Sequence, residues 1–146
     1  MNNLITDKMI ILDQSLKTKD EVIRTLAQKI NNVGRLNDIC KYIEAVKKRE
    51  ADFPTSMGFC VAIPHGKSDA VKTSSLAFLR LNEMVKWSEE EKVKYIFMIA
   101  VPSENSDDEH LKILAALSRH LMHEDFRKKL MTIQNAHELV DIIENM

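Results

Sequence analysis

The chain has 146 residues, of which 45% are hydrophobic and 29% charged, and this composition is typical of one soluble globular domain spanning residues 1–146. Its 21 Lys and Arg residues against 22 Asp and Glu leave a formal charge of -1, which argues against a nucleic-acid-binding protein that works by neutralising phosphates. No segment has the length of a membrane span and the N-terminus lacks the basic region of a signal peptide, so we expect a cytoplasmic protein without membrane insertion.

The N-terminal part of the chain is predicted to contain a short strand and two helices. Met9–Leu12 is an apolar run that could form the strand. Thr18 opens a capping box and Gly34 is a C-terminal stop, and together they predict the first helix. The second helix is predicted to begin at Asn37 and to run out at Lys47–Glu50, where cations complement the carbonyl end of the helix dipole.

The next feature of the sequence is an apolar run that is closely followed by a histidine. Phe59–Ile63 is unbroken in its apolar character, so we predict a strand that is buried on both faces. Pro64 lacks a backbone donor, so the sheet ladder is predicted to stop there. His65 would then be the first side chain beyond the sheet, with Gly66 letting the backbone turn freely behind it. An imidazole at the end of a rigid strand is well placed for chemistry. The alternative is that His65 is a surface histidine in an ordinary loop.

The second half of the chain is predicted to add strands and helices that complete a layered fold. The predicted elements are strands at Ser74–Leu81 and Tyr95–Val101, a turn or short helix at Trp87–Glu90, and helices that begin at Ser106, Asp125 and Asn135. Strands that are apolar on both faces need a covering layer on each side. The predicted fold class is therefore α/β: a single-domain sandwich with a mixed β-sheet flanked by helices on both sides.

Two segments carry a pattern that is typical of a known family. The first is Arg49-Glu50, Phe53-Pro54-Thr55-Ser56, Gly58 and Val61-Ala62-Ile63-Pro64-His65-Gly66-Lys67, and the second is His110-Leu111, Leu114-Ala115 and Leu117-Ser118. In order and spacing they resemble the enzyme IIA component of the bacterial sugar phosphotransferase system, of the fructose–mannitol type. The similarity extends over essentially all of the chain.

This resemblance implies a phosphoryl relay. Such domains accept a phosphoryl group from the small histidine phosphocarrier protein (HPr), hold it on a histidine and pass it to a cysteine of enzyme IIB. The resemblance implies that His65 is phosphorylated and that His110 and Arg49 steady the phosphoryl group. Thr55 and Ser56 could supply hydroxyls or backbone amides to it, or serve as plain turn residues. No cofactor and no metal ion is expected.

The residue types suit this chemistry. A neutral imidazole keeps a lone pair near neutral pH and can attack phosphorus without a separate base. Arg49 offers a planar guanidinium that is always charged. The helix start favours the neutral form of His110, whereas Asp107 and Asp108 favour the protonated ring, so its protonation stays open. Candidates for an apolar docking collar around the first histidine are Phe53, Met57 and Phe59.

Three functions remain open on the sequence. The first is a relay subunit for uptake of a fructose-type sugar, with mannitol or galactitol as alternatives. The second is a regulatory, nitrogen-type member of the same family, which acts by phosphorylation-dependent protein binding. The third is a metal-dependent hydrolase using His65, His110, Asp107 and Asp108, which is disfavoured because the histidines lack short metal-ligand spacings.

Overall fold

The computed structural model describes residues 3–104 and 107–146, in which five strands form one mixed sheet. The strands are β1 (Ile10–Gln14), β2 (Val61–Ala62), β3 (His65–Ser68), β4 (Ser75–Lys86) and β5 (Lys92–Pro102). The helices are η1 (Asp7–Met9), α1 (Lys19–Asn32), α2 (Ile39–Asp52), α3 (Asp107–Leu121), α4 (Glu124–Thr132) and α5 (Ala136–Glu144). β4 and β5 form an antiparallel hairpin, β1 runs parallel to β4, and β2 and β3 both run parallel to β5.

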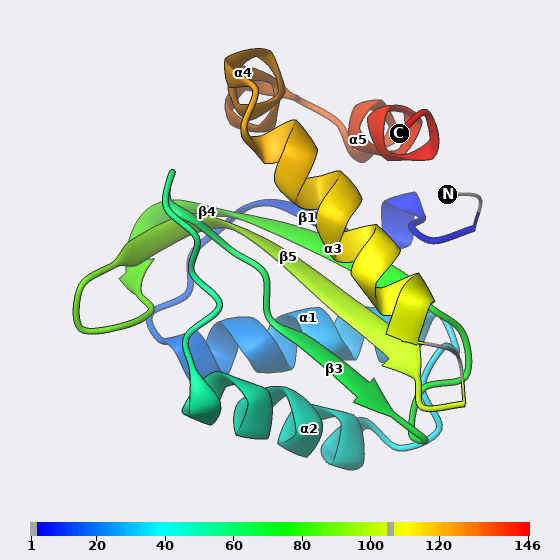
Figure 1. The fold of residues 1–146 in the computed structure, drawn as a ribbon. Coiled ribbons are helices and arrows are strands. Elements are labelled where there is room, and N and C mark those ends of the chain that lie inside the picture. Colours follow the sequence, from blue (N-terminus) through cyan, green and yellow to red (C-terminus); the bar gives the residue numbers. More distant parts are fainter. Residues whose placement is uncertain (1–2, 105–106) are drawn as a thin grey trace.

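Helices cover both faces of the sheet, as predicted. α1 and α2 lie on one face, and α3, α4 and α5 lie on the other (Figure 1). Alternate side chains of β5 divide between the two cores, because successive residues of a strand point to opposite faces. Met98 joins the core beneath α1 and α2, whereas Phe97 and Ile99 join the core beneath the C-terminal helices. The α/β sandwich with a mixed sheet is therefore confirmed. No helix in the described ranges has the length and apolar character needed to cross a bilayer.

The predicted capping residues Thr18 and Asn135 are confirmed. The Thr18 hydroxyl accepts a hydrogen bond from the backbone N–H of Glu21, and the Asn135 side chain caps α5 in the same way. α2 begins slightly later than predicted, with Asp38 as its N-cap, and continues to Asp52. The predicted N-cap at Ser106 lies outside the described residues.

The prediction of a buried strand over 59–63 is wrong at its first two residues. Phe59 and Cys60 have φ angles of 56° and 62°, in the left-handed region, and both side chains are exposed. They follow Gly58, whose φ is 88°, and the turn is closed by a 3.0 Å hydrogen bond from the Val61 N–H to the Gly58 carbonyl. Of the predicted strand over 59–63, only Val61–Ala62, which form β2, pair with β5, because the apolar run begins with an exposed turn that its composition does not reveal.

Pro64 does not end the sheet, contrary to the prediction. Its carbonyl accepts a 3.0 Å hydrogen bond from the backbone N–H of Ile99, and β3 continues the parallel pairing with His65 opposite Ile99. Within the described residues β3 pairs only with β5 and is an edge strand, where a proline without an N–H is tolerated. His65 is therefore the first residue of β3, inside the sheet rather than beyond it.

Gly66 permits close packing rather than a free turn. It lies within β3, and a Cβ at this position would lie 3.2 Å from both Tyr42 Cε1 and Val46 Cγ2. Both neighbours are fully buried, and the Tyr42 hydroxyl is held by a 2.8 Å hydrogen bond that it donates to the Ile99 carbonyl. α2 therefore packs directly against the backbone of the strand that carries His65.

We expect Gly66→Ala to lower the free energy of unfolding by roughly 1–3 kcal/mol, because the added methyl group overpacks a rigid contact. Urea denaturation measures the change. The control is a double-mutant cycle with Val46→Ala, which removes one of the two contacted side chains. The cost of the glycine substitution should shrink in that background, and unchanged stability of Gly66→Ala alone would contradict this packing argument.

Candidate functional site

His65 is held by a hydrogen bond that determines which ring nitrogen is reactive. The side chain is only 8% exposed, and its Nδ1 lies 2.8 Å from the carbonyl oxygen of Ile63. A carbonyl oxygen can only accept, so in the neutral ring the proton is on Nδ1. Nε2 then keeps the lone pair and is the nucleophilic nitrogen.

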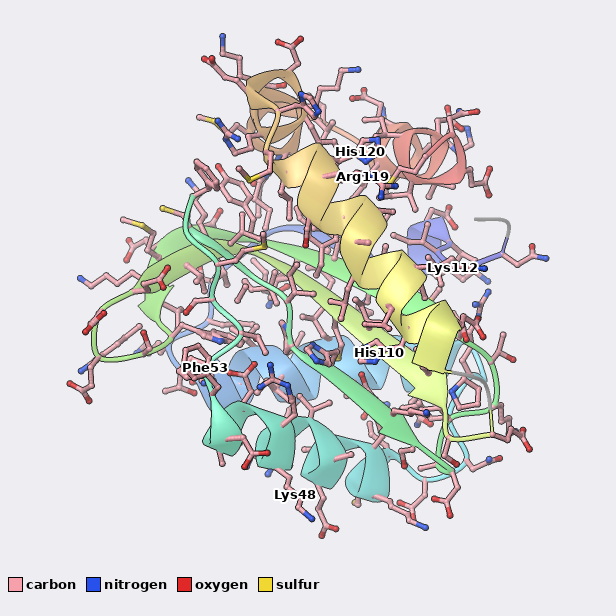
Figure 2. All side chains as sticks on the ribbon, viewed as in Figure 1. Lys48, Phe53, His110, Lys112, Arg119 and His120 are labelled. Atoms are coloured by element: carbon pink, nitrogen blue, oxygen red, sulfur yellow. The ribbon has the colours of Figure 1, made fainter. Side chains whose placement is uncertain are left out.

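His110, which lies in helix α3, contacts His65. It lies in the first turn of α3 (Figure 2). The centroids of the two imidazole rings are 4.8 Å apart, and the ring planes are tilted by 59°. Two histidines that are distant in the sequence are thus in contact.

Arg49 is the third residue predicted for this site. It lies in the last turn of α2, and its Nη1 donates a 2.7 Å hydrogen bond to the carbonyl of Phe53. Together with both histidines it lines a cavity of about 490 Å³. The polar and charged residues of this cavity are Lys48, Arg49, Asp52, His65, Lys67 and His110.

The residues that line the cavity come from α2, from β3 and from the first turn of α3. His65 and Lys67 are two residues apart in the strand and so point to the same face. The cavity has three cationic side chains, those of Lys48, Arg49 and Lys67. Its single carboxylate is that of Asp52. Such a surface suits an anion with several oxygens. Neither lysine was predicted, although Lys67 follows from its spacing once residue 65 is placed inside a strand.

Thr55 and Ser56 are not among the residues that line the cavity. The Thr55 hydroxyl donates to the carboxylate of Glu50, and the Ser56 hydroxyl donates to Glu91 Oε1 at 3.3 Å. These bonds hold the loop between α2 and β2. The predicted support of a phosphoryl group by these two hydroxyls stays a prediction.

Glu50 is a buried carboxylate whose role was not predicted. It accepts a 3.1 Å hydrogen bond from Trp87 Nε1, forms a 2.8 Å ion pair with Lys19 and binds the backbone and side chain of Thr55. A buried carboxylate with this many donors is well satisfied. It joins the end of α2, which carries Arg49, to the β4–β5 hairpin and to α1.

Two exposed apolar side chains flank the predicted site residues in the chain. Phe53 is 71% exposed and Leu111 is 60% exposed. Of the other predicted collar residues, Met57 is half-buried and packs against the core beneath the C-terminal helices. Phe59 is exposed, but its ring lies against Arg127 of α4. Leu111 was not predicted.

The structure describes the side chains of two of the four residues of the metal-dependent alternative, His65 and His110, and their rings are in contact. No group of three or more His, Cys, Asp or Glu side chains gathers there in a way that could hold a metal ion. The side chains of Asp107 and Asp108, which that hypothesis also uses, lie outside the described part of the chain.

The pKa of His65 is lowered from 6.5, mainly by burial, which disfavours the charged ring. The hydrogen bond to the Ile63 carbonyl acts in the opposite direction, the charge of Arg49 lowers the pKa, and the charge of Glu50 raises it. The net lowering means that the imidazole is neutral at pH 7 and keeps the Nε2 lone pair.

We therefore expect His65 to titrate below pH 6.5 and the fold to lose stability as the pH falls through this region. The unfolded chain takes up a proton at this residue near pH 6.5, whereas the folded protein does so only at lower pH. The unfolded state thus binds more protons in that window, and the free energy of unfolding decreases as the pH falls. Ring-proton NMR gives the midpoint, and His65→Gln should lack this part of the pH dependence. A midpoint at or above 6.5 would contradict the expectation.

Residues 3–146 match the family model described as "Phosphoenolpyruvate-dependent sugar phosphotransferase system, EIIA 2". A fructose-specific EIIA component of this system from Haloferax volcanii is 36% identical over 138 residues, which cover 93% of this chain and 89% of that protein. A fructose-specific EIIABC component from Bacillus subtilis is 33% identical over 145 residues, which are 98% of this chain and 23% of that protein. This chain thus spans about a quarter of the Bacillus protein's length.

Solved structures show the same fold. The nitrogen regulatory protein IIA-Ntr from Neisseria meningitidis has a TM-score of 0.85 and 30% identity, covering 93% of each chain. A second solved structure is the complex of enzyme IIAMtl and phosphorylated enzyme IIBMtl from Escherichia coli. It matches this chain with a TM-score of 0.82 and 24% identity, covering 98% of this chain and 100% of that one. From the family match and the Haloferax relative, this chain belongs to the EIIA type 2 family of the phosphoenolpyruvate-dependent sugar phosphotransferase system, whose members are phosphotransferases that carry phosphoryl groups between proteins.

Proposed function

We propose that this protein accepts a phosphoryl group from the histidine phosphocarrier protein HPr on Nε2 of His65 and passes it to a cysteine of enzyme IIB, for uptake of a fructose-type sugar. One observation carries the proposal. A neutral histidine with its Nδ1 bonded to a backbone carbonyl contacts a second imidazole in a cavity that also contains a guanidinium.

The two transfer steps balance without a cofactor. In the first, the Nε2 lone pair of His65 attacks phosphorus, and the P–N bond of the donor phosphohistidine breaks with its electron pair returning to the donor ring. The proton stays on Nδ1, where it is hydrogen-bonded to the Ile63 carbonyl. In the second, a thiolate of enzyme IIB attacks phosphorus, and the P–Nε2 bond breaks to restore the neutral imidazole. Neither step needs a separate base.

Arg49 and His110 act on the charge that spreads over the three equatorial oxygens during each transfer. Phosphoryl transfer depends largely on positioning and on electrostatic stabilisation. The guanidinium is anchored at one nitrogen by the Phe53 carbonyl, which leaves its other donors for phosphoryl oxygens. The imidazole of His110 can donate a further hydrogen bond. The exposed Phe53 and Leu111 side chains supply apolar contacts for the two partner proteins.

We also propose that the protein works in the cytoplasm, as one domain over residues 1–146, without nucleic acid. Its two cysteines, Cys40 and Cys60, are both free and exposed, and reduced surface thiols fit a reducing compartment.

The regulatory alternative has a specific observation in its favour, which is the close structural likeness to a nitrogen regulatory IIA protein. Two fructose-specific relatives favour sugar transport. Incubating the phosphorylated protein with fructose-type, mannitol-type and galactitol-type IIB domains separates the alternatives, with Cys→Ser IIB domains as controls. We expect fastest transfer to a fructose-type cysteine. Transfer to no IIB domain would favour regulation, and failure to accept a phosphoryl group from HPr would overturn both.

A further inference from the structure

A second cavity, of about 300 Å³, is lined by the turn before β2, by β2 and β5, and by helix α4. It shares no lining residue with the cavity of His65. Its apolar and aromatic walls come from Phe59, Tyr95, Leu130 and Met131, and its cations are Lys94 and Arg127. This volume is at the lower end of the range for small-molecule sites, which are mostly apolar with a few placed polar groups.

The wall formed by Phe59 is held in place by two features. The left-handed backbone at Phe59 and Cys60 turns the aromatic ring away from the core, at a cost on the order of 1–2 kcal/mol per residue. The guanidinium of Arg127 lies 4.0 Å from the ring centroid, and its Nη1 donates a 2.6 Å hydrogen bond to the Leu121 carbonyl. The phenyl ring therefore packs on the Arg127 guanidinium at the start of α4.

The cavity has an apolar base and an open mouth. Leu130 is 1% exposed and forms part of the base, whereas Phe59 and Met131 are 49% and 59% exposed at the mouth. Exposed apolar side chains around a concave surface are typical of a binding site rather than of an ordinary protein surface.

The charged side chains that line the cavity are of one sign. Lys94 and Arg127 are cationic, and none of the described residues that line the cavity is a carboxylate. Burial raises the pKa of the Tyr95 phenol, so its hydroxyl stays protonated and can donate a hydrogen bond. The cavity thus combines an apolar surface with positive charge and a neutral donor.

We propose that this cavity binds a small amphiphilic anion, such as an aromatic carboxylate or sulfonate, with its apolar body between Phe59 and Leu130 and its anionic group beside Lys94 and Arg127. The proposal is independent of the phosphoryl relay, because it uses none of the residues of the His65 site. The ligand class follows from charge complementarity with an apolar cavity of this size.

The test uses the full chain and the fluorescent anion anilinonaphthalene sulfonate, with phenylnaphthylamine as a neutral analogue of the same aromatic body. We expect saturable binding of one anion per chain and much weaker binding of the neutral analogue. Lys94→Glu should weaken binding of the anion by about tenfold, because it replaces the attraction with repulsion. Lys92→Glu is the matched control, since Lys92 is exposed on the same face of β5 but does not line the cavity.

Two further measurements keep the test decisive. Met131→Glu, at the exposed mouth, should weaken binding as Lys94→Glu does, so the outcome does not depend on one variant folding. The methyl resonance of Met131 should shift on binding, whereas that of Met122, which is 66% exposed and outside the cavity, should not. Equal effects of Lys92→Glu and Lys94→Glu, equal affinity for the neutral analogue, or no saturable binding would overturn the proposal.

Discussion

Replacing His65 with alanine should abolish phosphorylation of this protein. With enzyme I, HPr and labelled phosphoenolpyruvate, the unmodified chain should take up one phosphoryl group and His65→Ala none. The loss is expected to be complete, because the variant has no lone pair at the position of Nε2. Arg49 and the lysines of the cavity carry charge but are poor nucleophiles while protonated. The stoichiometry of acid-labile label is the measurement.

The matched control is His137→Ala, since the side chain of His137 is 78% exposed on α5 and lies far from the cavity in the fold. This variant should be labelled at full stoichiometry. Circular dichroism establishes that both variants are folded. Full labelling of His65→Ala would show that another side chain is the acceptor and would remove the basis of the relay.

Replacing His110 with alanine should slow phosphorylation by about 100-fold while leaving the final stoichiometry unchanged. The imidazole of His110 contacts the His65 ring, with centroids 4.8 Å apart, so its removal takes a hydrogen-bond donor from the phosphoryl group but leaves the nucleophile in place. Rapid-quench measurement of the label on the protein distinguishes a slower rate from a lost site. Transfer onward to enzyme IIB should slow by a similar factor, because the same donor serves both steps.

His120→Ala provides the comparison within the same helix. His120 lies at the opposite end of α3 from His110 (Figure 2), where its Nδ1 is 2.8 Å from the Ala116 carbonyl and its ring packs against Phe126. Its loss can cost some stability but should leave the phosphorylation rate nearly unchanged. A His110→Ala protein that reacts as fast as His120→Ala would show that the second imidazole is a packing residue.

The layered fold could be predicted because its signals are local. The two predicted strands, Ser74–Leu81 and Tyr95–Val101, have apolar residues on both faces. Such strands need a covering layer of helices on each side of the sheet. The capping residues Thr18 and Asn135 mark helix starts by their own hydrogen bonds, which depend on residues only three positions away. Such patterns can be read from a single chain.

The course of the chain around Pro64 could not be predicted, because it depends on contacts from distant elements. Phe59 and Cys60 are as apolar as the strand residues after them, and their exposure follows from the left-handed turn that Gly58 begins. Glu91, from the β4–β5 hairpin, holds that turn by accepting a 3.0 Å hydrogen bond from the Gly58 N–H. The continuation of the sheet depends on Ile99 donating to the Pro64 carbonyl.

Three residues of the candidate cavity were named from the sequence, but their geometry was not predicted. The resemblance to a family named His65, His110 and Arg49, and the structure brings all three to one cavity. The choice of Nε2 depends on where the Ile63 carbonyl points, and no sequence pattern specifies that direction. Lys67 was missed because residue 65 was placed beyond the sheet, which removed the strand periodicity that pairs the two side chains.

The central claim is that Nε2 of His65 carries the phosphoryl group in a cavity shared with His110. The most direct measurement is nitrogen–phosphorus and long-range proton–nitrogen NMR of the phosphorylated protein labelled with ¹⁵N-histidine. The structure predicts a phosphorus coupling to Nε2 of His65, a proton retained on Nδ1, and a chemical-shift change at His110. A phosphoryl group on Nδ1, or on any other histidine, would contradict the account.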